Sequence, residues 1–414
     1  MRRVVIMSGM LAALAVPALG AEAGDALKDA LYSGEFAAGV AKLDPLAAAD
    51  DPEAWFGLGA IRLTETIEGL VQALYRHGFA VPDGGALLGG PQMALPAAPD
   101  PQKLDYDGVR TILGDFVTGM DEAKASFLTA AQFGDYVIEI NPLAIRIDAN
   151  GDGTVAAEES LGTVLAALND PTLNELIASQ TGDGPKLDHF GFDRADAFWF
   201  AGYTQILAAQ ADLLLAHDFS SFVNAVFHRL FPKAGFPMQD YAAGGMLMLD
   251  PQSDTAIADA IAAIHTLDWP VSEPSRLAGV RQRLLEVLDL SRQNWAAIGE
   301  EIDDNYEWLP SPRQTTILPG ASIDDARVAA WLVTLDKAED VLEGRLLLPH
   351  WRFRQGFDLK AYFERATETD LVMLLTGMGA VPFLADGPIA SPDDFRAIQE
   401  AFGNDWLGYA FWFN

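Results

Sequence analysis

Oxygen-bearing side chains recur at alternate positions in the segment 148–159, which reads DANGDGTVAAEE. Positions one, three, five, seven and twelve of this segment are Asp148, Asn150, Asp152, Thr154 and Glu159. Calcium binds about six to eight oxygens from carboxylates, amides, carbonyls and water, and it accepts a bidentate carboxylate. Gly153, at position six, permits the positive φ that a sharp turn requires. The segment therefore predicts a binding site for Ca²⁺.

This spacing resembles the loop of the EF-hand family, and the resemblance covers this one loop of a 414-residue chain. It implies that Thr154 supplies its backbone carbonyl, that Glu159 binds through both oxygens, and that water completes the shell at Ala156. Apolar residues at helical spacing predict an exiting helix over 157–168, whereas the turn at Pro142 leaves room for little more than one entering turn. The sequence holds no second segment with this spacing. We interpret the site as one ion that fixes a turn, without the opening of a calcium sensor.

The histidines raise an alternative, a periplasmic hydrolase in which calcium is only a structural ion. His217 and His228 are eleven residues apart, close to three helical turns, and would share a face of one helix. However, Asp218 is suited to cap a new helix at Phe219, which would break that register and leave His217 as a core residue. The sequence lacks the H-E-x-x-H, G-x-S-x-G, P-loop and dinucleotide-binding patterns, so it supports none of the familiar enzyme classes.

Buried carboxylates are a second place to look for chemistry. The apolar helix expected over 198–216 carries Gln205 and Asp212 seven residues apart, on one face. A buried carboxylate needs either a partner or a raised pKa, which makes Asp212 a candidate functional group. An arginine partner such as Arg229 or Arg281 would instead make it structural.

Aromatic residues gather in the run 190–200, beside His189 and Asp193. Core packing explains such aromatics better than a ligand-binding role does, since aromatic side chains bury large areas wherever helices pack. Asp193 or Asp196 is suited to cap the helix that follows. A hydrolase centre would then lie near His189, His217 or Asp212.

The first residues are typical of a secretory signal peptide. Arg2 and Arg3 precede an apolar run over 4–19, and small residues follow, so we expect cleavage after Gly20, with Ala23 as the second candidate site. The run is shorter than the roughly 20 residues that a membrane span requires, and we expect no span in the mature protein. The chain has no cysteine, so disulfides and a lipid-bearing cysteine are excluded. We expect a periplasmic or secreted protein.

The chain is strongly acidic, with a net charge of −32. Phosphate groups would be repelled, which excludes nucleic acid as an expected partner. Such acidity suits cations, basic proteins or simple solubility.

Helical periodicity dominates and strand alternation is scarce, so we predict a mainly α, multi-helix globular protein with long connections marked by Pro and Gly. Apolar stripes predict one helix over 275–302 and another that begins with a capping box at Ser322 and Asp325 and ends at Gly344. Breaks in the helical pattern are expected at 82–101, 232–254, 268–274 and 309–320.

Residues 34–36 and 55–59 are each expected to open a helix, and together they resemble the tetratricopeptide repeat over about 60 residues. Pro45 departs from that pattern, because it would interrupt the second helix. The resemblance implies contact with a protein partner through the N-terminal helices, although a generic helical hairpin fits nearly as well. We divide the chain into a signal peptide (1–20), a hairpin segment with its linker (21–100) and a main helical domain (101–414) that contains the calcium loop.

The C-terminus is rich in aromatic residues, namely Tyr409, Phe411, Trp412 and Phe413. We expect these rings to pack against the body of the protein, because exposed rings would form an adhesive patch. The alternative is a tag that the export or assembly machinery recognises.

Overall fold

The computed structural model describes residues 19–80, 98–134, 136–163, 190–302, 304, 307–316, 323–403 and 412–413. Residues 1–18 of the predicted signal peptide (1–20), residues 164–168 of the predicted exiting helix (157–168) and His189 lie outside the described residues. Within them the protein is mainly α-helical, as predicted, and its strands form only short antiparallel pairs. None of the described helices is long and apolar enough to cross a membrane.

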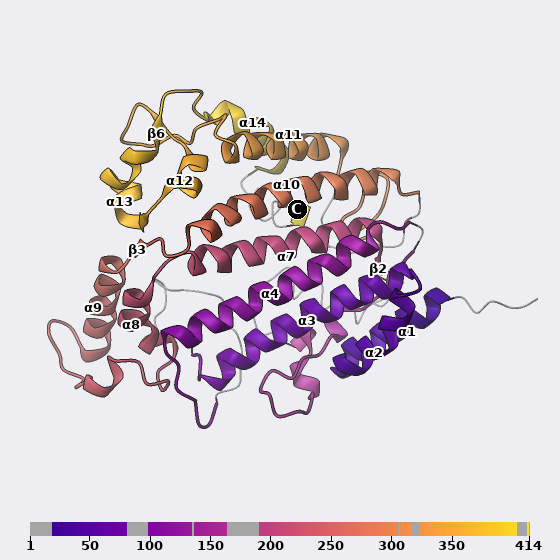
Figure 1. Ribbon diagram of the computed structural model, residues 1–414, viewed down its shortest axis with the longest axis horizontal. Helices are drawn as coiled ribbons and strands as arrows, with labels where there is room; N and C mark the ends of the chain where they lie inside the picture. The colour runs from indigo at the N-terminus through magenta and orange to yellow at the C-terminus, as the bar shows by residue number, and fades with distance from the viewer. Residues whose placement is uncertain are drawn as a thin grey trace, which may run out of the picture.

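A layer of long helices forms the body of the molecule (Figure 1). In spatial order these are α3 (Pro52–Arg76), α4 (Tyr106–Ala130), α7 (Arg194–Leu215) and α10 (Pro274–Glu300). The predicted helix over 275–302 corresponds to α10. Because α7 packs against α4 on one side and α10 on the other, it is buried around most of its circumference and includes the polar Gln205 and Asp212 in its buried set.

Aspartates start most of these helices by accepting backbone N–H groups of the first turn. Asp193 caps α7 as predicted, and its side chain accepts from the N–H groups of Ala195 and Asp196. α11 (Asp325–Leu342) is capped by Asp324, not by the predicted Ser322, which lies outside the described residues. Asp324 lies directly before the first helical residue, where its carboxylate reaches the N–H of the third.

The N-terminal helices α1 (Leu19–Ser33) and α2 (Phe36–Ala47) pack on each other and on α3. The predicted cleavage after Gly20 falls in the first turn of α1. The expected interruption at Pro45 is wrong, because this residue lies inside α2 only two positions before the helix ends, where few backbone bonds remain to be lost. A Cβ added at Gly39 would stand 2.4 Å from Cβ of Ala30, so glycine is required for this close helix contact.

Shorter elements surround the layer. α8 (Ser220–Leu230) and α9 (Pro251–His265) lie at one end of it, and α11 lies beside α10, followed by α12 (Leu359–Arg365), α13 (Leu371–Thr376) and α14 (Arg396–Phe402) (Figure 1). The strand pairs are β1 (Ile138–Glu139) with β2 (Gly191–Phe192), β3 (Asp268–Pro270) with β5 (Glu368–Asp370), and β4 (Gly356–Phe357) with β6 (Leu384–Ala385). The 3₁₀ turns are η1 (Pro142–Ala144), η2 (Ala157–Glu159), η4 (Gln239–Tyr241), η5 (Met378–Phe383) and η6 (Pro392–Phe395).

One large apolar cluster joins the N-terminal helices, the layer and the chain end. Phe413 is fully buried against Trp295, with ring centroids 4.9 Å apart, and its carbonyl accepts from Trp295 Nε1 at 3.1 Å. Trp412 is partly buried and donates through Nε1 to the carbonyl of Trp308. Packing of the tail against the body is therefore confirmed for these two residues, while Tyr409 and Phe411 lie outside the described part.

Candidate metal centre

The segment 148–159 is a loop closed at its base by strand-like pairing. Arg146 and Ser160 form an antiparallel bridge, and Leu161 N donates to the carbonyl of Ile145 at 2.8 Å. The entering side is the single turn η1, as predicted, with the side chain of Asn141 accepting from Leu143 N.

The exiting side differs from the prediction. η2 closes the loop, and Ser160 is then extended, with φ −75° and ψ 146°. A continuous helix from Ala157 is therefore wrong. Pairing with Arg146 holds Ser160 out of the helical conformation, and helical residues resume only at 161–163.

Asp148 is the residue around which the loop winds. Its Oδ1 accepts from the backbone N–H of Gly151 at 2.7 Å and of Asp152 at 3.2 Å, and its Oδ2 accepts from Gly153 N at 2.8 Å. Gly151 and Gly153 have φ values of +71° and +80°. The positive φ predicted for Gly153 is confirmed, and it is the backbone conformation, not a close neighbour, that requires glycine there.

The side chains at the next two predicted ligand positions, Asn150 and Asp152, also accept hydrogen bonds from the loop backbone. Asn150 Oδ1 accepts from Asp152 N, and Asp152 Oδ1 accepts from Thr154 N, both at 2.8 Å. Asn and Asp commonly form such bonds from the side chain to the backbone two residues ahead, and the resulting structures are called Asx turns. Each carboxylate has about four lone-pair positions, so these bonds leave oxygen capacity for an ion.

Glu159 brings the end of the loop back to its beginning. Its Oε1 accepts from Ala149 N at 3.0 Å and its Oε2 accepts from Ala156 N at 2.8 Å. The side chain is buried, in contrast to the exposed Asp152. The last predicted ligand thus contacts the backbone at the second and ninth positions of the loop.

Two residues of α3 that the sequence did not point to hold the loop from outside. Glu68 Oε2 accepts from Asp148 N at 2.7 Å, and Gln72 Nε2 donates to the carbonyl of Asp148 at 2.8 Å. These side chains are four residues apart and share one face of the helix. Burial raises the pKa of Glu68, although the bond from Asp148 N opposes this, and the charges of Asp148 and Glu159 raise it further.

The donor set of the loop suits calcium, because it consists of oxygens on a backbone already wound into a turn. Among the described residues, however, no three Asp, Glu, His or Cys side chains stand close enough together to hold a metal ion. The carboxylates of Asp148, Asp152 and Glu159 are thus apart in this structure.

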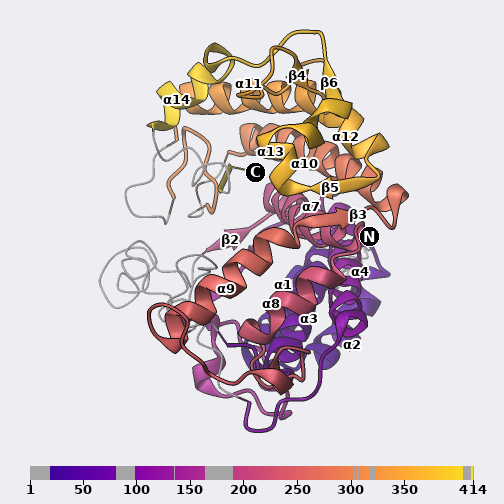
Figure 2. The same ribbon diagram turned by 90° about the vertical axis from the view of Figure 1, so that its left-hand side faces the viewer.

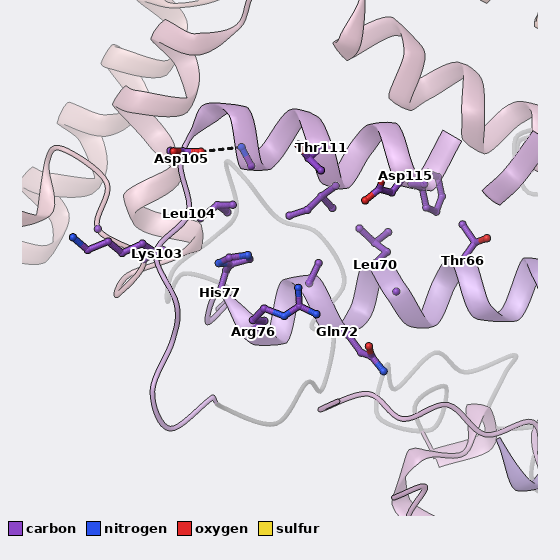
Figure 3. Close-up of a pocket in the computed structure, with 17 residues that line it drawn as sticks. Thr66, Leu70, Gln72, Arg76, His77, Lys103, Leu104, Asp105, Thr111 and Asp115 are labelled. Carbon is purple, nitrogen blue, oxygen red and sulfur yellow. Dashed lines mark hydrogen bonds between the residues drawn. The ribbon is translucent and has the colours of Figure 1, made fainter. Parts of the chain in front are cut away.

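Gln72 also borders two cavities, and Figure 3 shows the larger of them. The larger, of about 600 Å³, lies between the end of α3 and the start of α4, where Arg76, His77 and Asp115 line it. The smaller, of about 330 Å³, is lined by Arg76 and its neighbours at the end of α3, by residues between 98 and 102, and by Asn150 and Gly151 of the loop 148–159. The loop therefore lies beside open polar space of mixed charge.

The histidine candidates for catalysis are held by core partners. His217 is buried, its Nδ1 lies 2.7 Å from the carbonyl of Leu213, and its Nε2 lies 2.7 Å from Thr369 Oγ1. Burial lowers the pKa of His217, although the bond to the carbonyl of Leu213 acts against this shift. Asp218 accepts from Ser220 N, and α8 begins at Ser220, one residue later than predicted. The break between the two histidines is confirmed.

Asp212 has arginine partners, but not the predicted ones. It bonds to Arg276 and, at 2.7 Å, to Arg283 Nε, because α7 faces α10, where these arginines lie seven residues apart on one face. Arg229 instead pairs with Asp259 at 2.9 Å, and Arg281 pairs with glutamates 343 and 364. Arg229 and Arg281 are thus wrong as partners, while a structural role for Asp212 fits its contacts.

The aromatic run 190–200 packs into the large apolar cluster, as predicted. Asp196, which completes the cap of α7 with Asp193, is buried. Burial raises the pKa of Asp196 well above its usual range, and the charges of Asp193 and Glu307 add to this. These carboxylates belong to the helix cap, and none of their described contacts forms a catalytic arrangement with a histidine.

Comparison with known protein families, with curated proteins and with solved structures finds no match for this chain. Its function must therefore be argued from the geometry above.

Proposed function

We propose that this is an exported, periplasmic or secreted protein in which one calcium ion, held by the loop 148–159, stabilises the fold. The observation that carries the proposal is the position of Asp148. Its side chain organises the loop backbone, while its own N–H and carbonyl are bonded to Glu68 and Gln72 of α3. An ion bound to Asp148 would fasten the loop to the central layer of helices.

The ligands would be the side chains of Asp148, Asn150, Asp152 and Glu159, with the backbone carbonyl of Thr154. Burial is the main cause of the raised pKa of Glu68, and the negative charges of Asp148 and Glu159 raise it further. Calcium would supply positive charge to this group of carboxylates. Its contribution is therefore electrostatic as well as geometric.

A fixed structural ion fits these surroundings better than a sensor does. The entering side is one 3₁₀ turn, and the bridge between Arg146 and Ser160 closes the base. A sensor exposes a groove by separating two helices, and the entering turn offers no helix to move. The hydrolase alternative has no comparable support, because His217 and Asp212 already bond to core partners. A protein partner at α1 to α3 remains a proposal from the tetratricopeptide resemblance.

Differential scanning calorimetry of the full chain tests the proposal. At free calcium a hundredfold above the dissociation constant, stability should rise by about 2.7 kcal/mol. Magnesium should do less, because it demands octahedral geometry and releases water reluctantly. Glu159→Gln should remove most of the calcium effect, whereas Glu158→Gln, an exposed neighbour outside the ligand positions, should leave it unchanged. Equal responses of the two variants would contradict the proposal.

A further inference from the structure

Seven apolar side chains stand exposed on and just before α9, at the end of the helical layer that faces the viewer in Figure 2. We call them the α9 surface: Met246, Leu247, Met248, Leu249, Ile257, Ile261 and Ile264. Their exposed fractions range from 51 % at Ile257 to 85 % at Leu247. Folded monomers rarely expose large contiguous apolar patches, and such patches mark interaction sites.

These residues form one continuous surface. Asp254, Ile257, Ile261 and Ile264 follow the alternating spacing of three and four that places residues on one face of a helix. The carboxylate of Asp254 accepts the N–H groups of Leu247 at 2.6 Å, Met248 at 2.8 Å and Leu249 at 3.0 Å. The segment before α9 is thereby held at the end of the isoleucine row, with its side chains outward.

The outer face of α9 carries no charge between Asp254 and His265. The one ionisable residue between them, Asp259, is buried on the opposite side, where it bonds to His228 at 3.3 Å and to Arg229 at 2.9 Å. Such a face is unusual on a chain with a net charge of −32. This uncharged face offers no carboxylates that could form ion pairs with a basic partner. It also allows two copies of the acidic chain to come into contact without placing like charges opposite each other.

We propose that the α9 surface joins two copies of this chain into a two-fold dimer. A two-fold interface must be complementary to itself, and a row of isoleucines with heptad-like spacing meets this condition because it forms the seam of paired helices. With the two α9 helices antiparallel, residues 246–249 of one copy meet the Ile264 end of the other.

The area is sufficient for such a contact. Seven side chains that bury on the order of 100 Å² each give about 700 Å² per copy, close to the roughly 800 Å² per partner of a standard interface. The α9 surface shares no residue with the calcium loop, so the dimer is independent of the calcium proposal.

Sedimentation velocity of the full chain over about 1 to 100 μM tests the dimer. We expect a monomer–dimer equilibrium that shifts toward dimer as sodium chloride is raised from about 50 to 500 mM, since salt screens the repulsion between two acidic copies. Chelation of calcium should not change it. A monomer throughout this range would overturn the proposal. Flotation of such a monomer with neutral phosphatidylcholine vesicles would assign the surface to lipid instead.

Paired variants locate the interface. The double substitution Leu247→Asp with Ile261→Asp should weaken dimerisation at least about 100-fold, because it places charges in an apolar contact in both copies. Its thermal unfolding should match that of a wild-type monomer, since both side chains are exposed. Val333→Asp, on α11 and 45 % exposed, is the matched control and should leave the dimer intact. A double variant that dimerises like the wild type, or disruption by Val333→Asp, would overturn the assignment.

Discussion

Arg283 connects three helices of the central layer, and replacing it with methionine tests whether Asp212 is a structural residue. From α10 its guanidinium bonds to Asp212 of α7 through Nε at 2.7 Å and to Asp121 of α4 through Nη2 at 2.7 Å. Methionine keeps much of the apolar stem and removes the charge. Asp212 would then retain Arg276 as its partner.

The size of the effect follows from burial. Removing one partner of a buried ion pair destabilises a protein by roughly 3–5 kcal/mol. The side chain of Asp212 is only 7 % exposed, but in the variant it still pairs with Arg276. The side chain of Asp121 is 40 % exposed, so water can hydrate it when Arg283 is removed. We therefore expect Arg283→Met to lower the free energy of unfolding by about 3 kcal/mol.

Urea denaturation at neutral pH measures this change. Arg292→Met is the control on the same helix, since its partner Asp336 is exposed and its partner Glu339 is partly exposed, and exposed pairs contribute less than about 1 kcal/mol. A loss for Arg283→Met no larger than the loss for Arg292→Met would refute the structural interpretation of Asp212.

The wild type and Arg283→Met should also differ in how their stability changes in acid. Burial acts to raise the pKa of Asp121, but its hydrogen bonds with Arg283 and Gln205 outweigh this and hold the pKa below its usual 3.8. A lowered pKa stabilises the fold at pH values above 3.8, and this stabilisation is lost as the pH falls through the folded-state pKa. The difference between wild type and Arg283→Met should therefore shrink below about pH 4.

Three further predictions concern the chain end, α3 and export. Phe413→Ala should lower the free energy of unfolding by about 3–5 kcal/mol in urea denaturation, because the ring is fully buried; unchanged stability would contradict this packing. Glu68→Gln keeps an acceptor for Asp148 N–H and removes the charge. Since the pKa of Glu68 is raised from 4.5, its ionisation should destabilise the wild type as the pH rises from 4.5 through the folded-state pKa, so the wild type should lose more stability over that range than the variant. Mass spectrometry of protein from the native host should find a mature N-terminus at Ala21 or Gly24, and an intact Met1 in the cell envelope would disprove cleavage.

Local features were predictable because they depend on residues close in sequence. The cap at Asp193, the turn at Asn141 and the positive φ of Gly153 each arise from bonds or sterics within a few residues. The break between His217 and His228 was predicted at the right place, although Phe219 and not Asp218 precedes α8 as its cap residue, and pairing with residues 270–271 also holds the chain there.

Tertiary partners were not predictable in this way. Asp212 could have met any arginine until the structure placed α7 against α10, and Glu68 and Gln72 lie about 80 residues before the loop that they hold. The extended Ser160 arises from pairing with Arg146, which overrides the helical pattern that follows. The isoleucines of α9 repeat like a buried helix face, and only the fold shows that this face is exposed.

Hydrogen exchange with and without calcium tests most directly whether an ion fastens the loop 148–159 to α3. In about 10 mM calcium, amide exchange should slow in the loop and in the part of α3 that carries Glu68 and Gln72, because binding raises the free energy of local opening. Glu158→Gln should keep this protection, and Glu159→Gln should lose it. Identical exchange in both segments with and without calcium would contradict the account.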